Sequence, residues 1–435
     1  INILFDILPG CVRNVFMYKN RNPKQVRDVI ELAEDQEFIR NELKRLDIVS
    51  FAADGSVLPR ETGISDRPMK GSVPFSSPES LKITLNLPHH GPLCGMAVRR
   101  GITLIVGGGY HGKSTLLKAL EAGVYNHIAG DGREYVITDS TAVKLRAEDG
   151  RSISNVDISL FINDLPNGRD TSRFSSADAS GSTSQAAAVI EGIEAGAAAF
   201  LIDEDTSATN FMLRDELMQK IVSRDKEPIT PFIERARDLY EKAGISTVLV
   251  AGSSGAYFYI ADTVIQMDSY RPLDITEQVK KACEAYREIS SPALTAPGFS
   301  LPKPGRKLPA PAASSDSGRG GANSGDRRGN RKQDDRIKVK IFGRDSFQVG
   351  KEPVDLRFVE QLADSEQTAA LAQMVRFCLE RGLFSRCTLK DTVDILMLEY
   401  EKKGLAAFNG SNYTAMGLCM PRVQEIYACL NRFRG

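Results

Sequence analysis

The pattern of apolar and polar positions predicts a chain built mainly from alternating strands and helices. Residues 24–46 place apolar side chains at helical spacing among charges, which predicts one or two amphipathic helices. Residues 81–87 alternate (LKITLNL), which predicts an edge or antiparallel strand. From there to about residue 270, short apolar runs alternate with helical patterns, which predicts a mostly parallel sheet flanked by helices. The strand-like runs are 102–106, 135–138, 199–202, 247–250 and 263–267.

The pattern changes after residue 290. Residues 291–336 are rich in Pro, Gly and Arg and poor in apolar residues, which predicts a disordered linker. A strand pattern over 337–342 and helical patterns over 365–382, 389–403 and 421–433 follow. We therefore expect an α/β protein in four segments: an N-terminal α+β flanking domain (1–78), a central α/β domain (79–290), the linker (291–336) and a small, mainly helical C-terminal α+β domain (337–435).

Composition excludes several classes of function. The chain has 435 residues with 56 basic and 56 acidic side chains, so a nucleic-acid surface would need local segregation of charge. Its seven cysteines form no C-x-x-C pair, which favours a reducing compartment, and four histidines disfavour a zinc site. No apolar stretch approaches the ~20 residues of a membrane span, so we expect no membrane partner. The chain begins at Ile1 without a methionine, and we expect a further N-terminal segment.

A phosphate-binding loop follows the first strand of the central segment. The sequence GGGYHGKST at 107–115 matches G-x-x-x-x-G-K-[ST] between a buried strand and a helix. Glycines let backbone N–H groups surround phosphate oxygens, and the helix N-terminus faces the same place. Lys113 is then expected to bridge the β- and γ-phosphates of ATP, and the Ser114 hydroxyl to hold Mg²⁺. The residues expected to contact nucleotide are Gly107, Gly108, Gly109, Tyr110, His111, Gly112, Lys113, Ser114 and Thr115.

A second constellation lies between residues 176 and 211. Ser180, Gly181 and Ser182 form a small-residue turn before an alanine-rich helix, which is a second candidate anion site. The buried run 199–202 then ends in Asp203 and Glu204. An acid at the end of such a strand is placed to hold Mg²⁺ through water, and the following glutamate to deprotonate an attacking water.

In this order the motifs resemble the ABC class of ATPases. The resemblance is closer to one branch, the predicted soluble ABC-class ATPases without transmembrane segments, and covers nearly the whole chain except the linker. The blocks that carry it include TLIVGGGYHGKSTLLKALE, GVYNHIAGDGREYVITD, KLRAEDGRSISNVDIS, FINDLP, ASGSTSQAA, LIDEDTSATNF, DKEPITPFI, ADGSVLPRETGISDRP and PRVQEIYACLNRFR. A kinetoplastid member of this family belongs to the mitochondrial RNA-editing machinery, and the present chain is similar to it.

The resemblance implies that residues 79–290 fold as an ABC-type ATPase domain and act as a homodimer. Two ATP molecules would lie between head-to-tail subunits, with Ser180–Ser182 of one subunit against the γ-phosphate held by the other. Carried over by position, Lys113 and Ser114 bind phosphate and Mg²⁺, Asp203 holds the metal through water, and Glu204 is the catalytic base. The resemblance also implies a mitochondrial location.

The sequence departs from the wider ABC pattern at three places. The usual glutamine is absent between Thr115 and Ser180. Asp157 is a candidate to replace it as a metal ligand. AGSSG follows the run 247–250, where the class has a switch histidine; Ser253 there can donate a hydrogen bond but carries no charge, which predicts slow turnover. Phe75 is a poor candidate for stacking on adenine, so the preference for ATP rests on the resemblance.

The linker offers a candidate RNA-binding segment. Arginine and glycine can follow a phosphate backbone without sequence preference, and the basic residues concerned are Arg319, Arg327, Arg328, Arg331 and Lys332. A solvated tether explains the same composition equally well. We expect an ATP-dependent RNA-binding accessory factor of RNA editing, working within a protein complex. Two alternatives remain open: a nucleotide-gated scaffold that recruits proteins with little turnover, and a DNA-maintenance ATPase.

Overall fold

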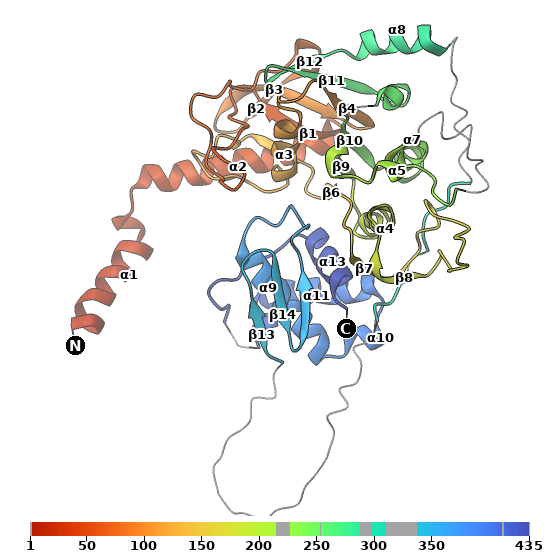
Figure 1. The fold of residues 1–435 in the computed structure, drawn as a ribbon. Helices are drawn as coiled ribbons and strands as arrows, with labels where there is room; N and C mark the ends of the chain where they lie inside the picture. The colour runs from red at the N-terminus through yellow and green to blue at the C-terminus, as the bar shows by residue number, and fades with distance from the viewer. Residues whose placement is uncertain are drawn as a thin grey trace, which may run out of the picture. The chain divides into compact units, whose positions relative to one another are not determined.

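The computed structural model describes residues 2–214, 227–252, 254–287, 298–303, 305–309, 337–410 and 413–434 (Figure 1). The chain forms two compact units. The first contains Ile1–Ala142, Ala198–Asp205 and Ala236–Ala293, and the second contains Val143–Ala197, Thr206–Arg235 and Leu294–Gly435. None of the described helices combines the length and hydrophobicity that a bilayer span requires.

The first unit begins with helices and an antiparallel sheet. A short π-helix (Ile3–Ile7), α1 (Leu8–Phe16) and a 3₁₀ turn (Tyr18–Asn20) precede α2 (Pro23–Arg45), which confirms the helix expected over 24–46. Asn22 caps α2 by accepting from the Lys24 N–H, and Pro23 suits the first helical position because its missing N–H needs no partner. The sheet has the order β2-β3-β1-β5, from β1 (Ile48–Ala53), β2 (Lys82–Leu87), β3 (Gly91–Arg99) and β5 (Val136–Thr138).

The larger sheet of the first unit contains the parallel strands expected from the apolar runs. Five of its strands lie in this unit in the order β12-β11-β4-β10-β9. Strands β11, β4, β10 and β9 pair parallel with one another in this order, whereas β12 pairs antiparallel with β11. Their bounds are β4 (Ile102–Val106), β9 (Ala199–Asp203), β10 (Ser246–Val250), β11 (Thr263–Asp268) and β12 (Arg271–Asp274), and the unit also holds α8 (Thr276–Arg287) and most of α7 (Phe232–Ala243).

Helix α3 (Lys113–Ala122) lies between the two sheets of the first unit. Its apolar face, which includes Leu116 and Leu120, is fully buried against residues of β1 and β3 on one side and of β4, β9 and β10 on the other. Burying several leucine-sized side chains at about 1.5–3 kcal/mol each fixes this helix firmly. Lys113, the first residue of α3, therefore lies at the start of a helix that packs against both sheets.

The structure of the first unit differs from two of the expectations. The run 135–138 forms β5, which pairs antiparallel with β1 rather than joining the parallel sheet. The boundary expected at residue 78 does not divide the structure, because β1 pairs with β3 across it. Local sequence cannot reveal either pairing, since both join segments far apart in the chain.

The second unit contains an arm built around one helix. Helix α4 (Gly181–Glu194) packs against the antiparallel hairpin of β7 (Arg151–Val156) and β8 (Phe174–Ala179). The short elements β6 (Val143–Leu145) and α5 (Thr209–Met212) also contact α4. Three aromatic rings, Phe161, Phe211 and Phe232, pack together with centroids 5.1–6.4 Å apart.

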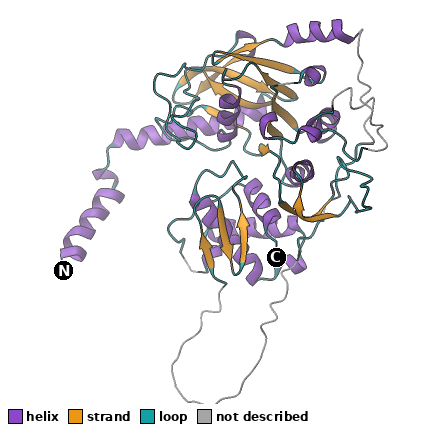
Figure 2. Ribbon diagram, in the orientation of Figure 1, coloured by secondary structure: helices purple, strands orange, loops and turns teal. Residues whose placement is uncertain are grey.

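The second unit also contains the C-terminal α+β part, with a three-stranded antiparallel sheet and five helices (Figure 2). The strands and helices expected there are confirmed, with ends shifted by a few residues. Their bounds are β13 (Val339–Ile341), β14 (Ser346–Val349), β15 (Glu352–Asp355), α9 (Ser365–Glu380), α10 (Leu383–Arg386), α11 (Leu389–Lys403), α12 (Ala406–Asn409) and α13 (Val423–Arg432).

Part of the expected linker belongs to this core. Leu308 is buried in the C-terminal apolar cluster, and the Arg306 guanidinium pairs with the carboxylate of Glu194 in α4. Arg306 and Leu308 therefore differ from the expected disordered tether, because both side chains have partners in the second unit.

Candidate nucleotide-binding site

Strand register brings three loops to one edge of the larger sheet. Ile105 of β4, Val250 of β10 and Asp203 of β9 lie in one row across three parallel strands. The segments that follow these residues therefore leave the sheet at the same level. Ligands of open α/β sheets bind at this edge, beyond the carboxyl ends of the strands.

The loop after β4 has the backbone geometry of an anion cradle. Gly107 has φ +139° and Gly112 has φ +98°, and both conformations favour glycine. A Cβ at Gly107 would lie 2.4 Å from the Met267 carbonyl oxygen, and one at Gly112 would lie 2.9 Å from the Tyr270 ring. Tyr110 also has a positive φ, +64°, and its side chain is exposed. The expected loop residues from Gly107 to Thr115 are thus held in one compact turn.

Lys113 closes this loop from the first turn of α3. Its Nζ donates to the carbonyl oxygens of Gly107 and Gly108 at 2.7 and 2.9 Å. Ser114 and Thr115 follow in the same turn and are partly buried. The helix N-terminus thus places a cation, two hydroxyls and the positive end of a helix dipole together. This combination suits a phosphate chain.

The two acids after β9 have different surroundings. Asp203 is buried at the end of its strand, and its Oδ1 accepts from the Asp205 N–H at 3.2 Å. The Glu204 carboxylate crosses to the loop after β10, where Oε2 accepts from the Gly252 N–H at 2.5 Å. Glu204 also faces Tyr257, whose pKa is raised well above its usual value by burial and by the Glu204 charge. The phosphate loop, both acids and Gly252 therefore share one sheet edge.

A hairpin turn that sequence analysis missed supports the phosphate loop from the other side. Ser269 and Tyr270, between β11 and β12, both have positive φ. Their N–H groups donate to His111, to Nδ1 at 3.0 Å and to the carbonyl oxygen at 3.1 Å. No glycine or asparagine marks this turn, so the usual sequence signal for such a hairpin is absent.

The expected Ser180–Ser182 turn forms the N-terminus of α4 in the second unit. Ser180 is the N-cap residue and is exposed, whereas Gly181 and Ser182 are buried. The Ser180 Oγ makes hydrogen-bond contacts with the hydroxyls of Thr183 and Ser182 at 3.0 and 3.3 Å. Its side chain therefore does not cap the helix, and the turn presents hydroxyls beside the start of a 14-residue helix.

The remaining residues that were considered for the site lie in different parts of the chain. Phe75, the poor candidate for stacking on adenine, is 2% exposed inside the core of the first unit, where it packs against apolar side chains. Asp157 lies in the second unit and accepts hydrogen bonds from Ser159, whereas Ser114 and Asp203 lie in the first, so its metal role stays a prediction. Ser253 and the basic residues Arg319, Arg327, Arg328, Arg331 and Lys332 lie outside the described residues.

Two sequence blocks far from the phosphate loop meet in the first unit. Arg60 donates to both carboxylate oxygens of Asp131 at 2.9 and 2.8 Å, and the His127 Nδ1 lies 2.7 Å from the same carboxylate. Burial alone would raise the pKa of Asp131, but the hydrogen bonds from His127 and Arg60 outweigh it and lower the pKa to about 2. Arg60, His127 and Asp131 belong to two of the sequence blocks that carry the family resemblance. Part of that resemblance therefore comes from residues that stabilise the fold.

Comparison with known proteins identifies the domain around the phosphate loop. A family model described as the P-loop domain of ABC ATPases matches residues 22–296. The chain belongs to the ABC ATPase family. Within that family it carries a second match over residues 338–435, to a model described as the MRB1590 C-terminal domain.

Two individual proteins are similar to this ABC ATPase. An uncharacterised protein, MJ1628, from Methanocaldococcus jannaschii is 29% identical over 269 residues. The match covers 59% of this chain and 59% of the archaeal protein, so the chain spans under two thirds of that relative. The structure of cbiO1 from Clostridium perfringens, part of the ABC transporter complex cbiONQ, aligns with a TM-score of 0.35 and 11% identity over 56% of this chain and 94% of cbiO1.

Proposed function

We propose that this ABC ATPase is a homodimer that binds two ATP molecules, hydrolyses them slowly and acts as an RNA-binding accessory factor of mitochondrial RNA editing. One observation carries the nucleotide part of the proposal. The register of three parallel strands places the phosphate loop, Asp203 and Glu204 at the same sheet edge. The second layer of each ATP site would come from the Ser180–Ser182 turn of the other subunit.

The residues at this edge fit ATP with Mg²⁺. Lys113 would leave the carbonyls that it now contacts and bind the β- and γ-phosphates, for which it is the only cation of the loop. The Ser114 hydroxyl and the Asp203 carboxylate are oxygen ligands of the kind Mg²⁺ prefers. No described group of three or more His, Cys, Asp or Glu side chains could hold a metal alone, so phosphate oxygens would complete the site. When bound, the metal would neutralise charge on the phosphates.

Glu204 would act as the general base. Its Oε2 accepts from the Gly252 N–H, and a carboxylate has further acceptor positions for the proton of an attacking water. The loop after β10 offers that N–H where the wider class has a cationic histidine, so less charge would stabilise the transition state.

Measurement of phosphate release tests the enzymatic part. We expect slow, protein-dependent ATP hydrolysis that falls by roughly a hundredfold or more in Glu204→Gln, because a general base contributes about 10²–10⁴-fold. Glu241→Gln, which alters an exposed glutamate of α7, is the matched control. ATP binding without measurable hydrolysis in the unsubstituted protein would favour the nucleotide-gated scaffold instead.

The RNA part of the proposal rests on two supports of different kinds. The C-terminal part matches the MRB1590 C-terminal domain model, and the Arg-Gly segment joins that part to the ATPase domain. Flexible arginine-rich segments bind single-stranded RNA through phosphates and base faces. A mitochondrial location and a protein complex of RNA processing follow from the same resemblance.

Filter binding across a salt series tests the RNA part. In the test variant, glutamine replaces Arg319, Arg327, Arg328, Arg331 and Lys332, which keeps the segment length unchanged. We expect weaker binding of single-stranded RNA and a salt slope reduced by up to about 3.5, since each phosphate contact contributes about 0.7. Unchanged affinity and slope would show that the segment is only a tether.

A further inference from the structure

The turn at the start of α4 is fastened to the loop that follows β6. Ser184 is fully buried in the first turn of α4, where its Oγ donates to the Gly181 carbonyl oxygen at 2.9 Å. The same Oγ accepts from the Glu148 N–H at 2.9 Å. A Cβ at Gly181 would lie 3.1 Å from the Asp149 Oδ1, which leaves little space between turn and loop. Movement of Glu148 therefore moves the Ser180–Ser182 turn.

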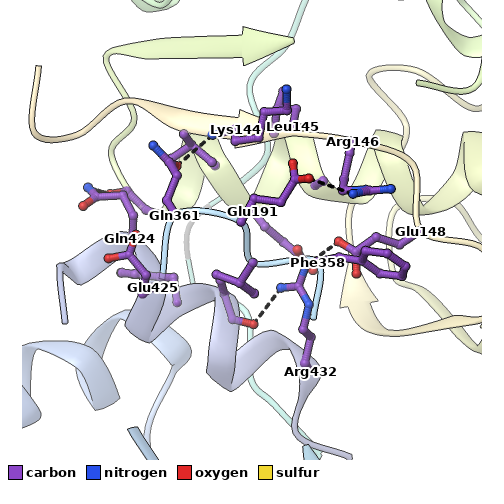
Figure 3. A pocket seen from close by; sticks show the side chains of 18 of the residues that line it. Lys144, Leu145, Arg146, Glu148, Glu191, Phe358, Gln361, Gln424, Glu425 and Arg432 are labelled. Carbon is purple, nitrogen blue, oxygen red and sulfur yellow. Dashed lines mark hydrogen bonds and ion pairs between the residues drawn. The ribbon is translucent and has the colours of Figure 1, made fainter. Parts of the chain in front are cut away.

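Glu148 is also one of the residues through which the C-terminal part contacts this loop, beside Arg146, which pairs with Glu360. Its carboxylate forms a hydrogen-bonded ion pair with Arg432, the last residue of α13 (Figure 3). The side chains of Arg432 and Glu148 are 10% and 7% exposed, so solvent screens the pair little. Burial alone would raise the pKa of Glu148, but the charges of Arg432 and Arg151 outweigh it and lower the pKa. The carboxylate is therefore charged at neutral pH.

The surroundings of this joint combine buried ion pairs with apolar packing. A cavity of about 60 Å³ lies beside it, lined by charged, amide and apolar side chains from β6, α4, α13 and the loop 358–361 (Figure 3). Arg151 pairs with Glu191 of α4 and places Nη1 4.0 Å from the Glu148 carboxylate. The buried ion pairs therefore join the loop after β6 to both α4 and α13.

We infer that Glu148 is a positioning residue through which the C-terminal part of the chain sets the location of the Ser180–Ser182 turn. A ligand or strain that moves α13 then changes how readily the turn of one subunit meets the nucleotide of the other. The C-terminal part thereby regulates ATP-driven closure. This inference rests on the proposed function, and it adds a regulatory input to the same site.

The test separates nucleotide binding from closure. In full-length Glu204→Gln protein, which would retain ATP, Arg432→Gln and Glu148→Gln each remove one charge of the pair. The measured quantities are the ATP concentration at half-maximal dimerisation, by sedimentation velocity, and the affinity of the monomer for ADP, by fluorescence titration. Arg422→Gln is the matched control, because it breaks an ion pair of similar burial in α13 that does not reach Glu148.

We expect both test variants to require about tenfold more ATP for dimerisation, as coupling between sites is typically worth 5–150-fold. Affinity for ADP should change less than twofold. The double variant should need no more ATP for half-maximal dimerisation than either single variant does, because both substitutions break the same ion pair. A merely structural role would lower thermal stability without moving the dimerisation midpoint. Should Arg432→Gln fail to fold, Glu148→Asp, which keeps the charge and shortens the side chain, should show the same shift.

Unchanged dimerisation in folded Arg432→Gln and Glu148→Gln proteins would overturn this inference alone. An equal shift in Arg422→Gln would also overturn it, because the effect would then be general to α13. If the Glu204→Gln protein without any further substitution failed to bind ATP or to dimerise, the proposed function would be overturned as well. The two claims therefore fail by different results.

Discussion

At the scale of single residues, Gly107 shows how the sheet edge fixes the phosphate loop. Its φ of +139° carries the chain out of β4 in a conformation that side-chain-bearing residues rarely adopt. Because Gly107 has no Cβ, the loop can approach the Met267 carbonyl of β11, with which any side chain at this position would clash. The glycine is therefore required by the neighbouring strand as well as by the phosphate.

Gly107→Ala should distort the loop. We expect a loss of thermal stability and at least a tenfold weaker affinity for ATP, because a Cβ in so sparsely populated a backbone conformation costs about 1–3 kcal/mol before the contact with Met267 is counted. Gly109→Ala is the matched control for stability, since a Cβ there meets nothing within 4 Å. Equal thermal midpoints for the two variants would contradict this reading of Gly107.

Asp131 gives a residue-scale prediction that depends on pH. Its folded pKa of about 2 lies below the usual value of 3.8, so the native state binds this proton less readily than the unfolded chain does. The stabilisation is therefore complete above about pH 4 and is lost as pH falls through about 2.

Asp131→Asn should cost about 1–3 kcal/mol at pH 7, the usual range for hydrogen bonds to a charged group. The difference in unfolding free energy from the parent should shrink between pH 4 and pH 2.5 in urea titrations. Arg45→Gln, which breaks an exposed ion pair with Glu42, should change stability by under 1 kcal/mol. A constant difference from the parent at all pH values would contradict the ion-pair account of Asp131.

At the scale of elements, the sequence predicted the strands with continuous apolar runs and the helices with clear periodicity. Strands β4, β9 and β10 are buried on both faces, so nearly every residue is apolar and the run is recognisable. The hairpin β7–β8 was missed because its register shifts twice and much of β8 is exposed and polar. Such irregularities break the alternation of apolar and polar residues by which a strand is recognised in a sequence.

The candidate site was predictable only where its residues are close in sequence. The phosphate loop and the Asp203–Glu204 pair are each contiguous, and their glycines, lysine and acids follow from phosphate chemistry. The approach of Glu204 to Gly252 depends on the register of β9 against β10, and the support from Tyr270 depends on a hairpin without a turn signal. Phe75 was a poor candidate for stacking on adenine from the start, because an aromatic residue upstream of the loop fits the core as well as it fits a base, and the structure buries it in the core.

At the scale of the whole molecule, the account depends on one arrangement of two chains. The ABC-type domain has a phosphate loop and two acids at one sheet edge, and a separate turn of hydroxyls begins α4. In the proposed function, each feature alone would be half of a nucleotide site. The central claim is that two copies join these halves around ATP, with the C-terminal part setting how readily they meet.

Sedimentation velocity of the Glu204→Gln variant with Mg²⁺ and radiolabelled ATP tests this claim most directly. The account predicts a monomer without nucleotide and a dimer holding two ATP molecules with it. It also predicts that Lys113→Ala in the same background stays monomeric, because the proposed contact of the lysine with the phosphates would be lost. A variant that binds ATP yet remains monomeric at every protein concentration, or that binds no ATP at all, would contradict the account.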